Sequence, residues 1–145
     1  MNLEKLNLKL KKENLWVLKK RLEVISIYFL DSYAIIEIVK NNKKYEKFKY
    51  TTNFIGIMNL LEVHYNINKD FGIIVADSVI EKLKEVVVDI NINDIKEASR
   101  FRFKHIKKKF SFIDCLGYVM AKNRKYVFVT ADKEFDGIDN VEFVK

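Results

Sequence analysis

The chain has 145 residues, 49% of them apolar and 13% aromatic, a composition that excludes a disordered chain and suits one globular domain. Lys and Arg outnumber Asp and Glu by 27 to 20, and the formal net charge of +7 favours a nucleic-acid partner, although solubility alone would also explain it. There is no uncharged apolar run of about 18 residues, no secretory signal and only one cysteine, so we expect no membrane span and a cytoplasmic location.

Hydrophobic patterning predicts alternating strands and helices from residue 24 onwards. The apolar run at 24–30 is typical of a central strand covered on both faces. Asn53 is expected to cap a long helix. The alternation predicts an α/β domain with a mostly parallel sheet between two layers of helices. In chain order we expect a strand at 24–30, a helix at 33–39, a short strand at 47–52, helices at 54–68 and 73–85, a strand at 86–88, helices at 94–108 and 111–123, and strands at 126–129 and 141–144.

Acidic residues follow two of the predicted strands. Asp31 follows the first strand, and Asp132 follows the strand at 126–129, with Asp136 one short turn later. If these strands are parallel neighbours, their acids meet at the carboxyl-terminal edge of the sheet, where α/β proteins form their sites. The alternative for Asp31 and Asp132 is a helix N-cap, and for Asp136 a solvated turn.

Two further acids lie on predicted helices. Glu62 has apolar neighbours on nearly every side, so we expect a largely buried helix in which this carboxylate needs a cation, a hydrogen-bond partner or a solvent-filled cleft. Asp114 follows Ser111 in a Ser-x-x-Asp pattern, so it is either the acid of a capping box or a polar point at the end of a buried helix. Clustered carboxylates repel one another unless they bind protons or a metal, and oxygen ligands suit Mg²⁺ or Mn²⁺.

The order and spacing of these segments resemble the PIN-domain ribonucleases, in particular the small VapC-type toxins and their archaeal relatives. The stretches that carry the resemblance are LDS at 30–32, TNFIGIMNLLE at 52–62, SFID at 111–114 and VTADKEF at 129–135. No single stretch is specific, but the four in sequence are fairly specific. The resemblance covers roughly residues 25–145 and implies a sandwich of helices around a parallel sheet of four or five strands.

The resemblance also implies a function, that of a metal-dependent endoribonuclease hydrolysing RNA phosphodiester bonds, as in the toxin of a toxin–antitoxin pair. It implies one or two Mg²⁺ or Mn²⁺ ions, an RNA substrate, an antitoxin partner and a homodimer. The alternatives are a catalytically silent PIN-fold module that binds RNA or protein, and an RNA-processing or DNA nuclease outside any such pair. The implied site consists of the catalytic and metal-binding acids Asp31, Glu62, Asp114 and Asp132, the further metal-binding acid Asp136, and the ligand-orienting residues Ser32 and Thr130.

Basic residues gather in two stretches of the sequence. One follows a helical spacing of four residues and the other directly precedes the strand that leads to Asp132. We expect them to contact the RNA backbone, the alternative being an ordinary solvated helix face. The predicted RNA-binding residues are Lys96, Arg100, Lys104, Lys108, Arg124 and Lys125.

Residues 24–145 are taken as a PIN-like domain, because this part of the chain resembles the nucleases. Residues 1–23 precede it as an N-terminal extension. Leu15, Leu18 and Leu22 have helical spacing, whereas the stretch at 6–10 alternates like a strand. We expect this extension to pack on the domain or on a partner.

Overall fold

The computed structural model describes residues 26–145, so the predicted extension at 1–23 lies outside the described part of the chain. The strands are β1 (Tyr28–Leu30), β2 (Asn53–Gly56), β3 (Val87–Val88), β4 (Val127–Thr130) and β5 (Val141–Phe143). The α-helices are α2 (Ser32–Val39), α3 (Ile57–Phe71), α4 (Ile73–Leu83), α5 (Ile92–Lys104) and α6 (Phe112–Asn123). Three 3-10 helices are η1 (Lys43–Tyr50), η2 (Lys84–Val86) and η3 (Lys133–Phe135).

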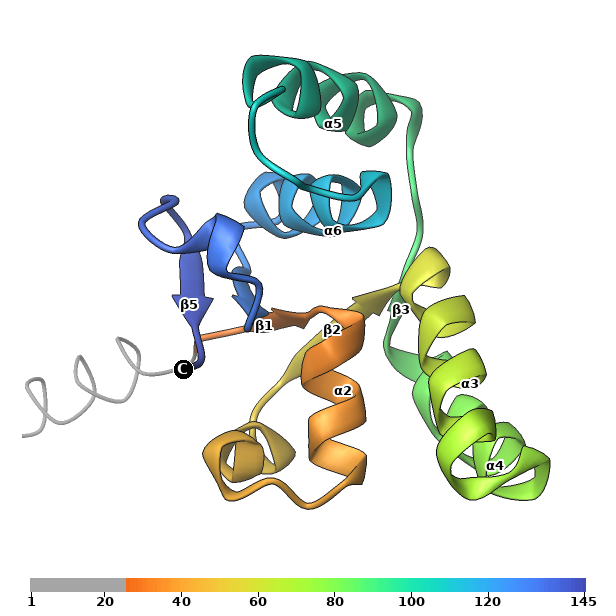
Figure 1. Cartoon of the computed structure of the whole chain (residues 1–145). Helices are drawn as coiled ribbons and strands as arrows, with labels where there is room; N and C mark the ends of the chain where they lie inside the picture. The colour runs from red at the N-terminus through yellow and green to blue at the C-terminus, as the bar shows by residue number, and fades with distance from the viewer. Residues whose placement is uncertain (1–25) are drawn as a thin grey trace, which may run out of the picture.

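The five strands form one sheet in the order β3-β2-β1-β4-β5, and every pair is parallel. Helices α5 and α6 lie on one side of the sheet, and α2, α3 and α4 lie on the other (Figure 1). The predicted α/β sandwich with a parallel sheet is therefore confirmed. Leu30 is in register with Val129, and the Asp31 amide donates to the Val129 carbonyl at 3.1 Å. The two strands that precede Asp31 and Asp132 are thus direct neighbours, as the position of their acids requires.

Each face of the sheet has its own hydrophobic core because successive strand residues point to opposite sides. Phe29 and Phe128 are completely buried and pack in the core that α5 and α6 cover. Leu30 and Val129 pack in the other core, with residues of α2, η1 and α3. The central strands are therefore apolar on both faces, which is why they read as continuous hydrophobic runs.

The predicted helix at 54–68 is wrong in its first turn, because Asn53–Gly56 is strand β2 and the helix begins at Ile57. Close packing fixes this boundary: a Cβ on Gly56 would lie 2.9 Å from the Asn59 Oδ1 and 3.3 Å from the Phe29 ring. The backbone therefore approaches both neighbours at a distance that only glycine allows. The strand predicted at 47–52 is also wrong, since η1 occupies most of it.

Helix α3 is less buried than its apolar composition predicts. Ile57, Met58, Leu61 and Tyr65 are 50%, 39%, 65% and 66% exposed, and the buried side of the helix is a narrower stripe. The expectation of a largely buried helix around Glu62 is therefore wrong, and α3 carries an exposed apolar face. No helix in residues 26–145 is both long and apolar enough to cross a membrane.

Candidate active site

Four of the five acids that the sequence singles out line one pocket at the carboxyl-terminal edge of β1 and β4. The pocket has a volume of about 540 Å³. Its polar groups are carboxylates, the hydroxyls of Ser32 and Tyr33 and the Asn66 amide, and neither histidine nor cysteine is among the lining residues. Cys115 is buried, and burial raises the pKa of its thiol to about 11, which leaves it without a role as a nucleophile. The lining residues are Asp31, Ser32, Tyr33, Ile36, Glu62, Asn66, Asp114, Ala131 and Asp132.

Asp31 is the most deeply buried acid of the pocket, with 5% of its surface exposed. It is the N-cap of α2, and its Oδ1 accepts the Ala34 amide at 2.6 Å. Burial raises the pKa of this carboxyl to about 7, and the negative charges of Asp114 and Asp132 add to the rise. Hydrogen bonds from Thr130 and the Ala34 amide offset only part of it. The site thus holds a carboxyl whose ionised form needs a nearby positive charge.

Asp114 and Asp132 are both helix caps and pocket residues, so the two alternatives for them are compatible. The Asp114 Oδ2 accepts the Ser111 amide at 3.1 Å, which completes a capping box at the start of α6. The Asp132 Oδ1 accepts the Glu134 amide at 2.9 Å at the start of η3. The second carboxylate oxygen of each makes no hydrogen bond to any residue in 26–145. One oxygen therefore fixes the side chain, and the other is free for a ligand.

Glu62 reaches the pocket from α3 and is held by Ser32 at the start of α2. The Ser32 hydroxyl donates to the Glu62 Oε2, and it accepts the Asn59 side-chain amide at 3.0 Å. Asn59 is 2% exposed, so this network is shielded from water. Ser32 therefore orients an acid of the pocket, and the Glu62 carboxylate has a hydrogen-bond partner.

Two amides of α3 belong to the site although the sequence pattern does not single them out. Asn59 supports Ser32, and Asn66 lines the pocket and donates to the Glu62 carbonyl at 2.8 Å. Asn59, Glu62 and Asn66 are spaced by three and four residues, so they lie on one helix face. That polar stripe in an apolar helix is the signal that would have found them.

Asp136 and Thr130 lie near the pocket but do not line it. Asp136 is exposed and lines a neighbouring cavity instead. Thr130 is 1% exposed; its hydroxyl accepts the Asp132 amide at 3.0 Å and also contacts Asp31. Thr130 thus positions Asp31 and Asp132, whereas Asp136 lies outside the pocket that the other four acids line.

The donor atoms of the pocket fit a divalent cation in type. Carboxylate, hydroxyl and amide oxygens are the ligands that Mg²⁺ and Mn²⁺ prefer. Burial, with a smaller effect from the charges of Asp114 and Asp132, raises the pKa of Asp31, and a bound cation would favour its ionised form. Within residues 26–145, however, no three side chains of His, Cys, Asp or Glu are grouped closely enough to hold a metal ion.

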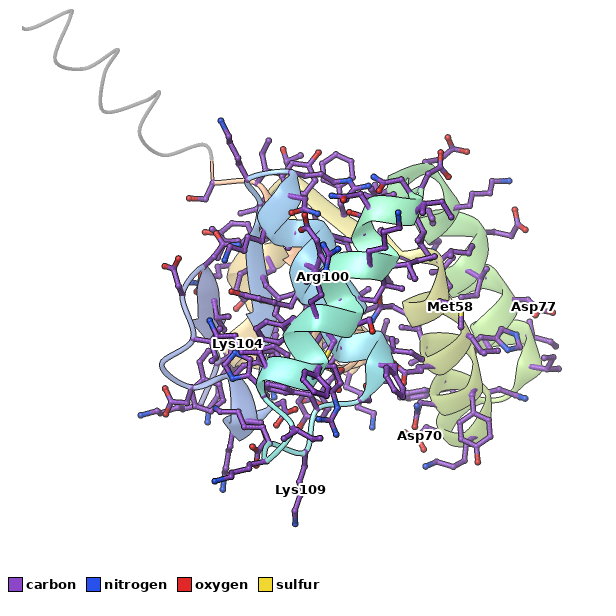
Figure 2. The ribbon with its side chains drawn as sticks, turned by 90° about the horizontal axis from the view of Figure 1, so that it is seen from above. Met58, Asp70, Asp77, Arg100, Lys104 and Lys109 are labelled. Carbon is purple, nitrogen blue, oxygen red and sulfur yellow. The ribbon has the colours of Figure 1, made fainter. Side chains whose placement is uncertain are left out.

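The basic residues divide between the surface and the interior. Lys96, Arg100 and Lys104 are exposed along α5, and Figure 2 shows Arg100 and Lys104 on this outer helix. Lys125 is exposed as well. The Lys108 ammonium donates to the Glu134 carbonyl, so it ties the loop after α5 to η3.

Arg124 forms an ion pair within the fold, and its contact with RNA stays a prediction. Its Nη2 and Nη1 lie 2.9 Å and 3.2 Å from the two oxygens of Asp94, which is completely buried. Asn91 and Asn123 complete the partners of that carboxylate. Burial acts to raise the pKa of Asp94, but Arg124 and the hydrogen bonds outweigh it and hold the pKa below its usual value. The pair joins the ends of α5 and α6.

The fold and pocket define an α/β protein with an acidic site at the edge of a parallel sheet. The family profile of the PIN domain matches residues 28–141, so the chain belongs to the PIN domain family. A search of curated proteins found no match.

Solved structures share the fold at low sequence identity. A toxin–antitoxin complex from Klebsiella pneumoniae aligns with a TM-score of 0.66 and 15% identity, covering 81% of this chain and 98% of that chain. VapC20 of Mycobacterium tuberculosis, a toxin that cleaves the sarcin-ricin loop, aligns with a TM-score of 0.65 and 15% identity over 80% of this chain and 98% of that one. VapBC2 from Rickettsia felis, bound to a DNA fragment from its promoter, aligns with a TM-score of 0.64 and 18% identity. The alignment covers 82% of this chain and 99% of that chain.

Proposed function

We propose that this chain is a divalent-metal-dependent endoribonuclease that hydrolyses RNA phosphodiester bonds in the acidic pocket. The observation that carries the proposal is the convergence of Asp31, Glu62, Asp114 and Asp132 on one pocket in a chain with a net charge of +7. An acidic pocket repels RNA unless cations offset its charge, so a site of this kind needs a metal to act on phosphate. Membership of the PIN domain family supports the same reaction.

The four carboxylates would hold one or two Mg²⁺ or Mn²⁺ ions through the oxygens that the caps leave free. When bound, such an ion lowers the pKa of a coordinated water and offsets charge on the phosphate oxygens. The chain itself supplies orientation: the caps of Asp31, Asp114 and Asp132 fix three acids on rigid elements. Ser32 fixes the fourth, and the exposed lysines and arginine of α5 hold the RNA backbone.

We also propose that the chain acts as the toxin of a toxin–antitoxin pair and forms a homodimer. The structural neighbours from K. pneumoniae and R. felis, which are toxin–antitoxin assemblies, support an antitoxin partner. The exposed apolar face of α3, formed by Ile57, Met58, Leu61 and Tyr65, supports association with another protein surface. Light scattering of the purified chain, alone and after co-expression with the product of a neighbouring short reading frame, tests both.

The nuclease proposal is tested by incubating the protein with a pool of structured and unstructured RNAs in Mg²⁺, Mn²⁺ or EDTA. We expect cleavage with either metal, none with EDTA, and a loss of at least about 100-fold in the Asp31→Asn variant. The matched control is Asp89→Asn, which removes an exposed acid that lines neither the acidic pocket nor its neighbouring cavity and should retain most of the activity. Equal cleavage by all three proteins, or cleavage in EDTA, would contradict the proposal.

A further inference from the structure

A second cavity adjoins the acidic pocket and has the opposite charge. Its volume is about 540 Å³, and it shares Tyr33 and Ala131 with the acidic pocket. Lys44, Lys133 and Lys145 line it, against a single carboxylate, that of Asp136. We call it the lysine cavity. A concave wall with an excess of positive charge attracts anions, whereas the adjoining pocket repels them.

The three lysines of this cavity are available to a ligand. None of them forms an ion pair with a carboxylate elsewhere in residues 26–145, although other lysines of the chain do, such as Lys40 with Asp70 at 2.7 Å. Lysine binds phosphate as a mobile point charge with three donors, and it does so without reading the base. The lysines of the cavity therefore suit a phosphate group better than a ligand of fixed shape.

A buried tyrosine of the same cavity has a hydroxyl with no partner. Tyr45 is 2% exposed, and its hydroxyl finds no hydrogen-bond partner among residues 26–145. Burial raises the pKa of this hydroxyl above its usual range, so it stays protonated and remains a donor. A buried donor without an acceptor costs about 1–3 kcal/mol. This hydroxyl is closed to solvent in the structure, so an oxygen of a ligand would recover that cost after a local shift of the cavity wall admits it.

An exposed aromatic ring stands between the two cavities. Tyr33 lines both of them, is 51% exposed, and packs edge-on against Tyr45 with 6.4 Å between the ring centroids. An aromatic ring with a free face stacks on nucleobases of any sequence. A single strand that crosses Tyr33 would place one phosphate beside the acids and the next nucleotide among the lysines.

We propose that the lysine cavity binds the nucleotide of an RNA strand that adjoins the phosphate in the acidic pocket. Its phosphate accepts from Lys44, Lys133 and Lys145, the Tyr45 hydroxyl donates to an oxygen of the same nucleotide, and a base stacks on Tyr33. The proposal rests on the nuclease function above and names the subsite that positions the substrate. The shared wall between the cavities favours a strand that occupies both over a separate small anion.

The test compares RNA binding by two double variants that lose the same charge. Lys44→Gln/Lys133→Gln removes two lysines of the cavity, and Lys43→Gln/Lys122→Gln removes two exposed lysines outside it. Fluorescence anisotropy with a labelled, unstructured single-stranded RNA gives Kd at several salt concentrations, in EDTA so that no cleavage occurs. Each phosphate contact contributes about 0.7 to the slope of log Kd against log salt for single strands. Because the lysines of the cavity share one phosphate, we expect the slope to fall by about 0.7 in the cavity variant and to stay unchanged in the control.

Tyr45→Phe probes the cavity without changing its charge. We expect RNA affinity to fall by about fivefold, because a hydrogen bond to the strand is lost, while urea unfolding shows no loss of stability. If the hydroxyl has no part in binding, affinity stays at the wild-type value. Equal slopes in the two double variants, together with unchanged affinity in Tyr45→Phe, would overturn the proposal.

The same samples, assayed with Mn²⁺, separate this proposal from the nuclease function. If the wild-type protein cleaves RNA but the two double variants have equal salt slopes, the lysine cavity is not an RNA subsite and the nuclease proposal stands. If the wild-type protein does not cleave RNA but the cavity variant shows the expected fall in slope, the nuclease proposal fails and the RNA-binding subsite stands.

Discussion

Replacing Asp31 with Asn is expected to stabilise the metal-free protein while it removes the activity. The Asp31 carboxyl has its pKa raised from 3.8 to about 7, first by burial and then by Asp114 and Asp132. The difference of about 3 pH units corresponds to about 4 kcal/mol of unfolding free energy, as an upper limit. Asn caps helices as well as Asp does, so the bond to the Ala34 amide is retained.

The pH dependence of this effect has a defined sign. Below about pH 4 the carboxyl is protonated in both the folded and the unfolded chain, so the substitution changes little. As the pH rises from about 4 to about 7, the unfolded chain releases this proton first, and the wild type loses stability relative to the variant. Above about pH 7 the difference is constant. The gain in the Asp31→Asn variant is therefore full at alkaline pH and absent in acid.

Urea unfolding in EDTA across this pH range measures the gain directly, with Asp136→Asn as the control for removing an exposed acid of the same charge. The reasoning is refuted if Asp31→Asn has the same effect at every pH, or if it destabilises the protein above pH 7. Adding Mn²⁺ should narrow the difference between wild type and variant, because an ion that binds only the folded wild type stabilises it by about 2.7 kcal/mol at 100 times its Kd.

Three further substitutions test the framework around the site. Arg124→Met should lower the unfolding free energy by about 3–5 kcal/mol in a urea titration, because it leaves the buried Asp94 unpaired. A loss below about 1 kcal/mol would contradict the structural role of the pair. Gly56→Ala should lower the unfolding free energy by about 1–3 kcal/mol in the same assay, since the new Cβ would lie 2.9 Å from the Asn59 side chain. An unchanged unfolding free energy would show that the backbone shifts to accommodate the Cβ. Ser32→Ala should reduce kcat for RNA cleavage by roughly 10-fold or more in protein that is still folded, because the Glu62 carboxylate loses the hydrogen bond that orients it. An unchanged kcat would remove Ser32 from the site.

The acids of the site were predictable from the sequence because their positions depend on local rules. Asp31 and Asp132 follow strands that are apolar on both faces, and parallel neighbours bring such residues to one edge. Asp114 is marked by its capping box with Ser111. Those same local signals could not separate a cap from a ligand, since the structure shows that one carboxylate serves as both.

The errors of the sequence prediction arise where contacts between distant residues decide. The stretch 53–56 is read as helix because apolar residues continue into α3, whereas its pairing with β1 and the contact of Gly56 with Phe29 make it a strand. Nothing next to Arg124 in the sequence reveals Asp94, which lies 30 residues away. The exposed apolar face of α3 likewise follows from its place at the side of the sheet, and apolar composition alone does not predict it.

The most direct test of the central claim is calorimetric titration of Mn²⁺ into the wild-type protein and into the Asp132→Asn variant. This measurement needs no knowledge of the RNA target, so an unmatched substrate cannot mask the result. The account predicts that the wild type binds Mn²⁺, releasing protons near pH 7, and that binding in the folded variant is at least about 10-fold weaker. A folded wild-type protein that binds no Mn²⁺, or a variant that binds it equally well, would contradict the claim that these carboxylates form a metal-dependent active site.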